Sequence, residues 1–365
     1  MASTCIFCSC FLQKTSKQEQ YTLQNPENVF TPSQLKFKNP PSKTSSRIDS
    51  ASSIDFSRDH GSHPNTLTEW WYFNGHLNGP SGENYSYAFC LFRRSPLLYF
   101  AHISFTDENN NVFNYARKFY TFPEVKLSKQ SADISYGKEQ IIEQLSQFEF
   151  RIKARLKNTS LNLLLKLEKP PLLINGNGQI KMEGGKSFYY SLTRLKTSGT
   201  VIMEDQSFAV SGISWMDHQW GNFHVISKKW DWFSFQMEDG TDYNLFSFRD
   251  KKNRMLRQYS NIHDDQNTFF SRKPINISRK NWWHNQQTSH LYTTEWEIIL
   301  PDQRDTFIVK ARTNNQELAI SKKLDFLPSY WEGACTVIKK TANGKIVKGL
   351  GFAEHFPYRG KKDNP

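Results

Sequence analysis

The chain has 365 residues and a formal net charge of +12, with 47 Lys and Arg against 35 Asp and Glu. A mean hydropathy of −0.67 and no long apolar run exclude a transmembrane helix, and ordinary Gly and Pro contents exclude a collagen-like or globally disordered chain. Aromatic residues make up 15% of the sequence. Positive charge with many aromatics fits a nucleic-acid binder or an all-β protein with an aromatic pocket.

The N-terminal residues 1–55 are predicted to form a disordered tail, because Ser, Thr, Lys, Gln, Asn and Pro dominate them. The apolar stretch that starts at Cys5 lacks the basic start and long apolar core of a clear signal peptide. Cys5 and Cys8 are spaced like metal ligands, but no second pair follows, so no metal site is expected there. Cys90 and Cys335 are predicted to be buried free thiols.

The body of the chain, which starts near residue 56, has the pattern of an all-β protein. Alternating apolar and charged residues predict a hairpin of strands 148–156 and 161–167 around a polar break at 158–160. A second hairpin is predicted over 229–248, with its turn at Asp239-Gly240. Further strands are predicted at 70–77, 85–93, 99–106, 294–300, 306–313 and 335–340, and a short helix at 138–148. Many short strands favour a sandwich or barrel.

Half of the net charge lies in residues 251–280, which hold eight basic and two acidic residues. No nucleic-acid-binding motif accompanies them, so nucleic acid is not expected as a partner. The segment is interpreted as a solvated or anion-facing surface loop, with attraction to an anionic membrane surface as the alternative.

The Trp residues cluster with acids and histidines, and some of the clusters lie on predicted strands. Glu69 and Trp71 share one face of their strand, while Trp70 and Tyr72 share the other. One face can be core and the other pocket, and the sequence leaves open which. Apolar walls raise the pKa of a carboxylic acid until it can donate a proton near neutral pH, and aromatic faces stabilise a developing cation. The alternative is a structural role, in which aromatics fill a core and acids bond backbone or Arg.

Six segments carry a family resemblance: DHGSHP at 59–64, TEWWYFNGHL at 68–77, YYSLTRL at 189–195, GISWMDHQWG at 212–221, DWFSFQ at 231–236 and YWEGA at 330–334. In these motifs and their order the chain resembles the AttH/carotenoid 1,2-hydratase (CrtC) family of lipocalin-like proteins. The resemblance implies two consecutive lipocalin-like β-domains, at 56–225 and 226–360, and a hydrophobic small-molecule ligand. It also implies an envelope or periplasmic location.

Relatives in that family include hydratases that add water to an isoprenoid double bond, and cyclases that act on polyenes. The His-x-Trp motif of the hydratases corresponds to His218 and Trp220. The chain departs from them in lacking a Tyr-x-Asp pair on the strand 243–250.

The sequence therefore predicts a cofactor-independent hydratase or cyclase for an alkene-bearing isoprenoid, polyene or lipid, and the alternative is a non-catalytic lipophilic carrier. Candidate acids are Glu69, Asp217 and Glu332, with His218 positioning water or taking a proton. The predicted pocket residues are Trp71, Tyr72, Tyr190, Trp220, Trp232, Gln236 and Tyr330. No metal and no cofactor are expected, and the chain is expected to be a monomer.

Overall fold

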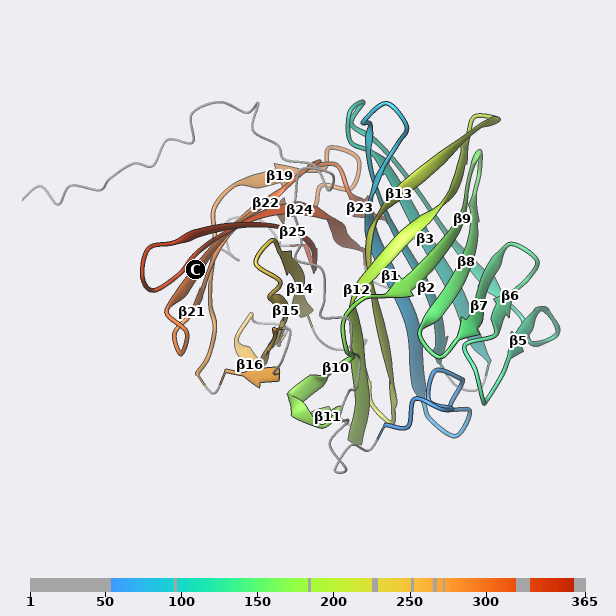
Figure 1. The fold of residues 1–365 in the computed structure, drawn as a ribbon, viewed down its shortest axis with the longest axis horizontal. Helices are drawn as coiled ribbons and strands as arrows, with labels where there is room; N and C mark the ends of the chain where they lie inside the picture. The colour runs from blue at the N-terminus through green and yellow to red at the C-terminus, as the bar shows by residue number, and fades with distance from the viewer. Residues whose placement is uncertain are drawn as a thin grey trace, which may run out of the picture.

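The computed structural model describes residues 54–94, 97–182, 185–224, 229–250, 253–264, 268–271, 273–319 and 329–357. Two large antiparallel sheets make up the molecule (Figure 1). The first consists of β1 (Thr68–Asn78), β2 (Asn84–Arg94), β3 (Leu98–Asp107), β4 (Val112–Tyr120), β5 (Val125–Leu127), β6 (Ile134–Tyr136), β7 (Gln140–Ser146), β8 (Glu149–Leu156), β9 (Thr159–Leu167), β10 (Leu172–Leu173), β11 (Gln179–Met182), β12 (Gly185–Met203) and β13 (Gln206–Gly221). The second consists of β14 (Lys229–Met237), β15 (Asp242–Arg249), β16 (Met255–His263), β17 (Thr268–Phe270), β18 (Asn276–Arg279), β21 (Glu295–Leu300), β22 (Asp305–Ala311), β23 (Glu317–Leu318), β24 (Tyr330–Lys340) and β25 (Ile346–His355). The remaining elements are the separate pair β19 (Trp282–His284) and β20 (Leu291–Thr293) and two short 3-10 helices, η2 (Phe122–Glu124) and η3 (Ile174–Gly176). This confirms the all-β fold predicted from the sequence.

The first sheet curls into a nearly closed barrel with the strand order β4-β3-β2-β1-β13-β12-β9-β8-β7-β6-β5. On β8, Phe150 and Ile152 point into the barrel, whereas Lys153 and Arg155 are exposed. The predicted hairpin of β8 and β9 is present, and its tight turn uses Lys157 with a positive φ of 44°. The period-two pattern therefore reports a sheet with one apolar face.

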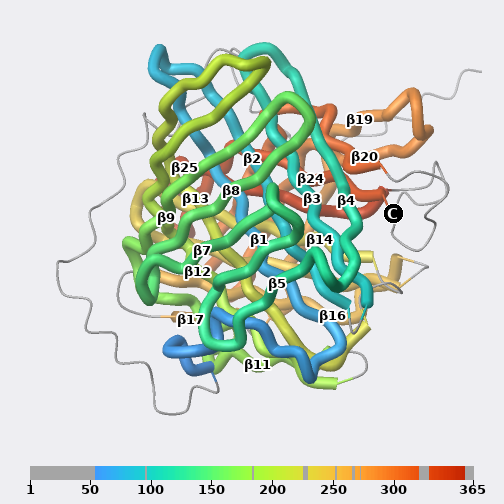
Figure 2. The backbone as a smooth tube through the Cα atoms, turned by 90° about the vertical axis from the view of Figure 1, so that its right-hand side faces the viewer, coloured from blue at the N-terminus to red at the C-terminus, as the bar shows by residue number. Residues whose placement is uncertain are grey.

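The second sheet forms a half-barrel that lies behind the first in Figure 2, in yellow, orange and red. The predicted hairpin of β14 and β15 is present. Phe233 and Phe235 of β14 point into this half-barrel, where they pack with Trp296 and Phe307. The predicted domain boundary near residue 225 lies outside the described residues.

The segment predicted as a short helix is a strand, and this prediction was wrong. Gln140–Ser146 forms β7, in which Ile142 lies opposite Ile152 of β8 and Glu143 pairs with Arg151 at 2.8 Å. Pairing with a neighbouring strand overrides a weak local preference. Among the described residues no helix is long and apolar enough to cross a membrane.

Some of the cysteines and the end of the predicted tail lie within the described residues. Cys90 and Cys335 are buried and free, as predicted. Ile54, at the end of the predicted tail, is buried in the barrel interior. The cysteines at positions 5, 8 and 10 lie outside the described residues.

The described part of the basic segment 251–280 lies on β16 to β18 and their connections, and residues 251, 252, 265–267 and 272 are outside the described part. The basic side chains that are described each have an acceptor or ion-pair partner: Arg254 with Asp250, Arg257 with the Lys181 carbonyl, Lys273 with Asp302, Arg279 with Asp231 and Lys280 with Glu297. Attraction to a membrane surface remains a prediction.

A buried polar cluster holds the two sheets together. β12 carries a bulge between Leu192 and Leu195, and the two bulge residues reach Asp242 of β15. Thr193 Oγ1 donates to Asp242 at 2.7 Å, Arg194 Nε at 2.9 Å and Lys169 Nζ at 3.0 Å. Burial alone would raise the pKa of Asp242, but the charges of Arg194 and Lys169 lower it.

Gln236 belongs to the same junction. Its side-chain amide donates to the carbonyls of Thr193, at 2.6 Å, and Ser214, at 3.2 Å. The structure thus places this predicted ligand-binding residue in contacts between the sheets, and it does not line the cavity described below.

Candidate functional site

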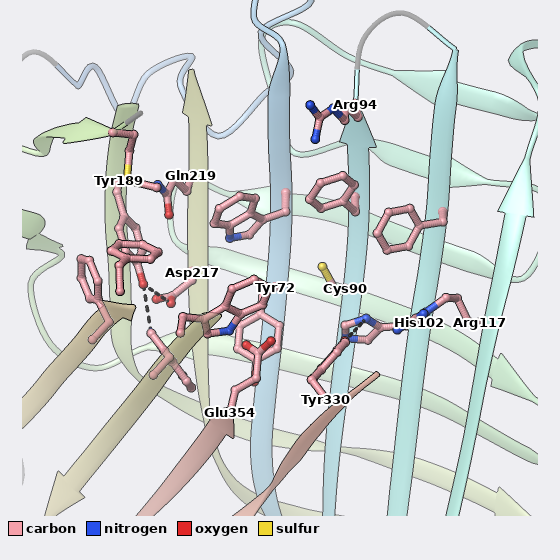
Figure 3. A pocket seen from close by; sticks show the side chains of 18 of the residues that line it. Tyr72, Cys90, Arg94, His102, Arg117, Tyr189, Asp217, Gln219, Tyr330 and Glu354 are labelled. Carbon is pink, nitrogen blue, oxygen red and sulfur yellow. Dashed lines mark hydrogen bonds between the residues drawn. The ribbon is translucent and has the colours of Figure 1, made fainter. Parts of the chain in front are cut away.

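A cavity of about 180 Å³ lies between the two sheets, outside both sheet interiors. Aromatic side chains form most of its wall: Trp70, Tyr72, Phe92, Phe100, Trp230, Trp232, Phe246 and Phe248. The polar groups in its lining are Arg94, His102, Arg117, Tyr189, Asp217, Gln219, Tyr330 and Glu354. Figure 3 shows Tyr189 and Asp217 on one side, His102 and Arg117 on the other, and Glu354 between them.

Asp217 of β13 is buried and accepts three side-chain hydrogen bonds. Ser191 Oγ and Trp215 Nε1 each donate to Oδ1 at 2.6 Å, and the Tyr189 hydroxyl donates to Oδ2. Burial raises the pKa of Asp217 to about 6, against the opposing effect of these hydrogen bonds. A carboxyl with this pKa is ionised in most molecules at neutral pH and can take up a proton during a reaction.

Tyr189 connects Asp217 to the second sheet. Its hydroxyl accepts from Asn244 Nδ2 at 3.0 Å and from Trp232 Nε1 at 3.2 Å while it donates to Asp217. Three partners fix the hydroxyl in one orientation at the cavity wall. Any proton that reaches Asp217 from the cavity can therefore pass through this hydroxyl.

Glu354 of β25 is a second carboxyl in the cavity wall, and its residue is half-buried. It lies directly opposite Glu332 of β24 in the strand register, so the two side chains share a face at close range. Burial raises the pKa of Glu354 well above its usual range, and the neighbouring Glu332 charge raises it further. Glu354 therefore holds its proton to a higher pH than an ordinary Glu does.

The other side of the cavity carries His102 of β3 and Arg117 of β4, which lie opposite each other in the register. The Tyr330 hydroxyl lies 2.6 Å from His102 Nδ1, and Glu332 Oε2 lies 3.5 Å from His102 Nε2. The Arg117 guanidinium lies over the Tyr330 ring, 5.7 Å from its centroid.

A separate polar network occupies the barrel interior near one end. Glu69 Oε1 lies 2.8 Å from His63 Nδ1 and 3.2 Å from His218 Nε2, and its Oε2 lies 3.0 Å from Arg93 Nη2. The Tyr190 hydroxyl lies 3.2 Å from His218 Nδ1. Burial alone would raise the pKa of Glu69, but hydrogen bonds from His218 and His63 lower it to about 2.

The ligand atoms of His63, Glu69 and His218 lie within 4.8 Å of one another, which is a spacing that a metal ion could use. The contacts above already pair each of these atoms, with the Arg93 cation against the carboxylate. The arrangement therefore suits a structural hydrogen-bond network without an added cation.

The structure divides the predicted site residues into two sets. Asp217, Tyr72, Trp232 and Tyr330 line the cavity, and Glu332 lies beside it, opposite Glu354. The other predicted residues, which are Glu69, His218, Trp71, Tyr190 and Trp220, lie on the barrel side of the same strands. His218 stacks on Trp71 at a ring distance of 5.0 Å and makes no contact with the cavity.

Sequence reasoning left Glu354, Tyr189, His102 and Arg117 out of the site. Strand alternation offered a signal for Tyr189, because it must face the opposite way from its neighbour Tyr190. For Glu354 the signal was the register of the last hairpin, which places it across from Glu332. Only the packing of the two sheets brings His102 and Arg117 to the same cavity.

Comparisons with known proteins agree with this architecture. The crystal structure of a protein assigned to AttH from Nitrosomonas europaea is similar, with a TM-score of 0.76 and 22% identity over 86% of this chain and 99% of that one. Kievitone hydratase from Nectria haematococca gives a TM-score of 0.74 and 18% identity over 92% of this chain and 100% of that one. Curated protein sequences gave no match.

A family model described as AttH-like matches residues 47–358. This span contains both sheets and every residue of the cavity wall. The chain therefore belongs to the AttH-like family.

Proposed function

We propose that this protein is a hydratase that adds water to a carbon–carbon double bond of a lipophilic substrate bound between the two sheets. The observation that carries the proposal is the presence, in one aromatic cavity, of two carboxyls with different pKa values: that of Glu354 is raised well above its usual range, and that of Asp217 is about 6. Alkene hydration needs both groups, because one carbon must gain a proton while the attacking water must lose one.

Glu354 is the general acid in this scheme. Its O–H proton adds to one alkene carbon, and the π electron pair forms the new C–H bond. The other alkene carbon becomes cationic. Its charge develops against the aromatic faces of Trp70, Tyr72 and Trp232, and such faces attract cations by about 0.5–2 kcal/mol each.

Asp217 is the base that completes the addition. Water attacks the cation through an oxygen lone pair, and its excess proton passes to the Tyr189 hydroxyl as Tyr189 gives its own proton to Asp217. The sum is one water added. Glu354 then regains a proton from solvent, and Asp217 releases one.

The reaction class agrees with the name of one protein that shares the fold, kievitone hydratase, although its low identity makes this agreement support only. Cyclisation of a polyene would begin with the same protonation by Glu354 and would end without water. A lipophilic carrier would use the same aromatic walls and no acid.

The test begins with the ligand. Lipophilic molecules that copurify with the protein are extracted, identified by mass spectrometry and incubated with fresh protein in heavy-oxygen water. A hydratase gives a product heavier by one labelled water, and Glu354→Gln and Asp217→Asn abolish its formation. An unlabelled isomer of the substrate would instead indicate a cyclase, and copurifying ligand that stays unchanged would indicate a carrier. Each of these two results contradicts the proposal.

A further inference from the structure

The guanidinium of Arg117 is a donor group that the scheme above does not use. Its Nε and Nη1 atoms are shielded from solvent, and neither has a hydrogen-bond partner among the described residues. A shielded donor without an acceptor is destabilising, and more so when it is charged. Arg117 also lines the cavity, so a bound molecule can reach it.

The neighbours of Arg117 leave this donor capacity free. The Tyr330 ring offers only its face, and the nearby Glu332 carboxyl lies toward His102, 3.5 Å from Nε2. The charge of Arg117 lowers the pKa of Glu354 from a distance, but burial and Glu332 outweigh that effect. A guanidinium in this state is best satisfied by an oxyanion, which can take two parallel N–H bonds.

We propose that Arg117 binds the carboxylate head of an amphipathic alkene acid, an assignment that rests on the proposed hydratase function and names its substrate class. The apolar chain of the substrate lies along the aromatic wall of the cavity, and the head lies at the β4 edge. Arg94, the other guanidinium of the wall, has one Nη held by His224 at 2.9 Å and one buried Nη without a hydrogen-bond partner among the described residues, and it lies apart from Arg117 in Figure 3.

The spacing of the strands gives the distance between the carboxylate head and the reacting double bond. The strand order from the head is β4, β3, β2, β1 and β13, and neighbouring strands are about 4.8 Å apart. Glu354 lines the cavity together with Tyr72 of β1 and Cys90 of β2, and after burial its charge and that of Glu332 raise the pKa of both residues. The double bond is therefore about 10–14 Å from the carboxylate, two to three strand spacings. The distal alkene of farnesoic acid meets this requirement.

The test measures binding, so it does not depend on turnover. Isothermal titration calorimetry compares farnesoic acid with methyl farnesoate, which has the same chain and no charge. We expect the wild-type protein to bind the acid at least tenfold more tightly than the ester. Arg117→Met should remove this preference by weakening the acid alone. Arg117→Lys, which keeps the charge but loses the planar fork, should retain part of it.

Lys118→Met is the matched control, because Lys118 is the next residue of β4, is exposed and pairs with Glu139 outside the cavity. It should keep the full preference for the acid. Equal binding of acid and ester by the wild-type protein would overturn the proposal, as would a preference that Arg94→Met removes and Arg117→Met leaves intact. Acid binding through Arg117 without any hydration would contradict the proposed function and leave this assignment standing. Hydration of neutral alkenes that Arg117→Met does not affect would support the proposed function and contradict the assignment of Arg117.

Discussion

The raised pKa of Asp217 has a consequence for folding that requires no substrate. Its value of about 6, against 3.8 for an ordinary Asp, means that the folded protein holds this proton more tightly than the unfolded chain. As pH rises between the two values, the unfolded chain ionises first and stability falls. A difference of about two pKa units at 1.36 kcal/mol per unit gives a loss of about 3 kcal/mol, complete above about pH 6.

The substitution Asp217→Asn removes this titration. Urea unfolding of wild-type and variant protein, followed between about pH 4 and pH 8, gives the free energy of unfolding of each. The altered hydrogen bonds to Ser191 and Trp215 add a constant offset, but the difference between the two curves should move by about 3 kcal/mol in favour of the variant as pH rises.

Tyr189→Phe extends the same test. It removes a donor that favours the ionised form, so the pKa of Asp217 should rise and the stability loss should continue to higher pH. A difference curve for Asp217→Asn that is flat across the pH range would refute the argument, because Asp217 would then ionise alike in the folded and unfolded states.

Three further predictions concern the acid, the junction of the sheets and the barrel network. Glu354→Gln should lower the hydration rate about 10²–10⁴-fold in a product assay. Glu332→Gln should lower the pKa of Glu354 and so move the alkaline loss of activity to lower pH. An unchanged pH–activity profile would contradict the effect of Glu332 on Glu354. Asp242→Ala removes the carboxylate that pairs with the buried cations Lys169 and Arg194 and should cost about 3–5 kcal/mol in urea unfolding; an unchanged midpoint would show that the cluster does not hold the sheets. Glu69→Gln should also destabilise, since the stability that its lowered pKa supplies is present above the unfolded pKa and disappears as pH falls toward about 2. The turnover of Glu69→Gln per folded molecule should stay unchanged, and a large loss of turnover would indicate that Glu69 takes part in catalysis.

The sequence predicted the β class because strand alternation depends on local contacts. The hairpins of β8 with β9 and of β14 with β15 could be read from alternation and turn residues alone. The segment of β7 was misread as helical because its pattern is ambiguous until β8 lies beside it. The long strands β12 and β13 yielded motifs but no strand assignment.

Only part of the candidate site could be predicted from the sequence. Strand alternation separates Trp71 on one face of β1 from Trp70 and Tyr72 on the other. Only tertiary packing decides which face is core and which is pocket. Trp71 and Tyr190 lie on the barrel side of their strands, whereas Asp217 and Trp232 lie on the side that lines the cavity. The raised pKa of Glu354 comes first from burial and then from the charge of Glu332, which is close in the register and 22 residues away in sequence.

The location of the cavity between two independently packed interiors bears on how such a protein diverges. Its wall is built from outward faces, so a new side chain there leaves the packing of Phe73, Phe150 and Leu163 in one interior and of Phe235 and Phe307 in the other undisturbed. The wall residues form a third buried cluster between the sheets, so the packing cost of a substitution there falls on that cluster alone. A change of lipophilic ligand therefore requires repacking only where the two sheets meet, and both sheet interiors can stay as they are.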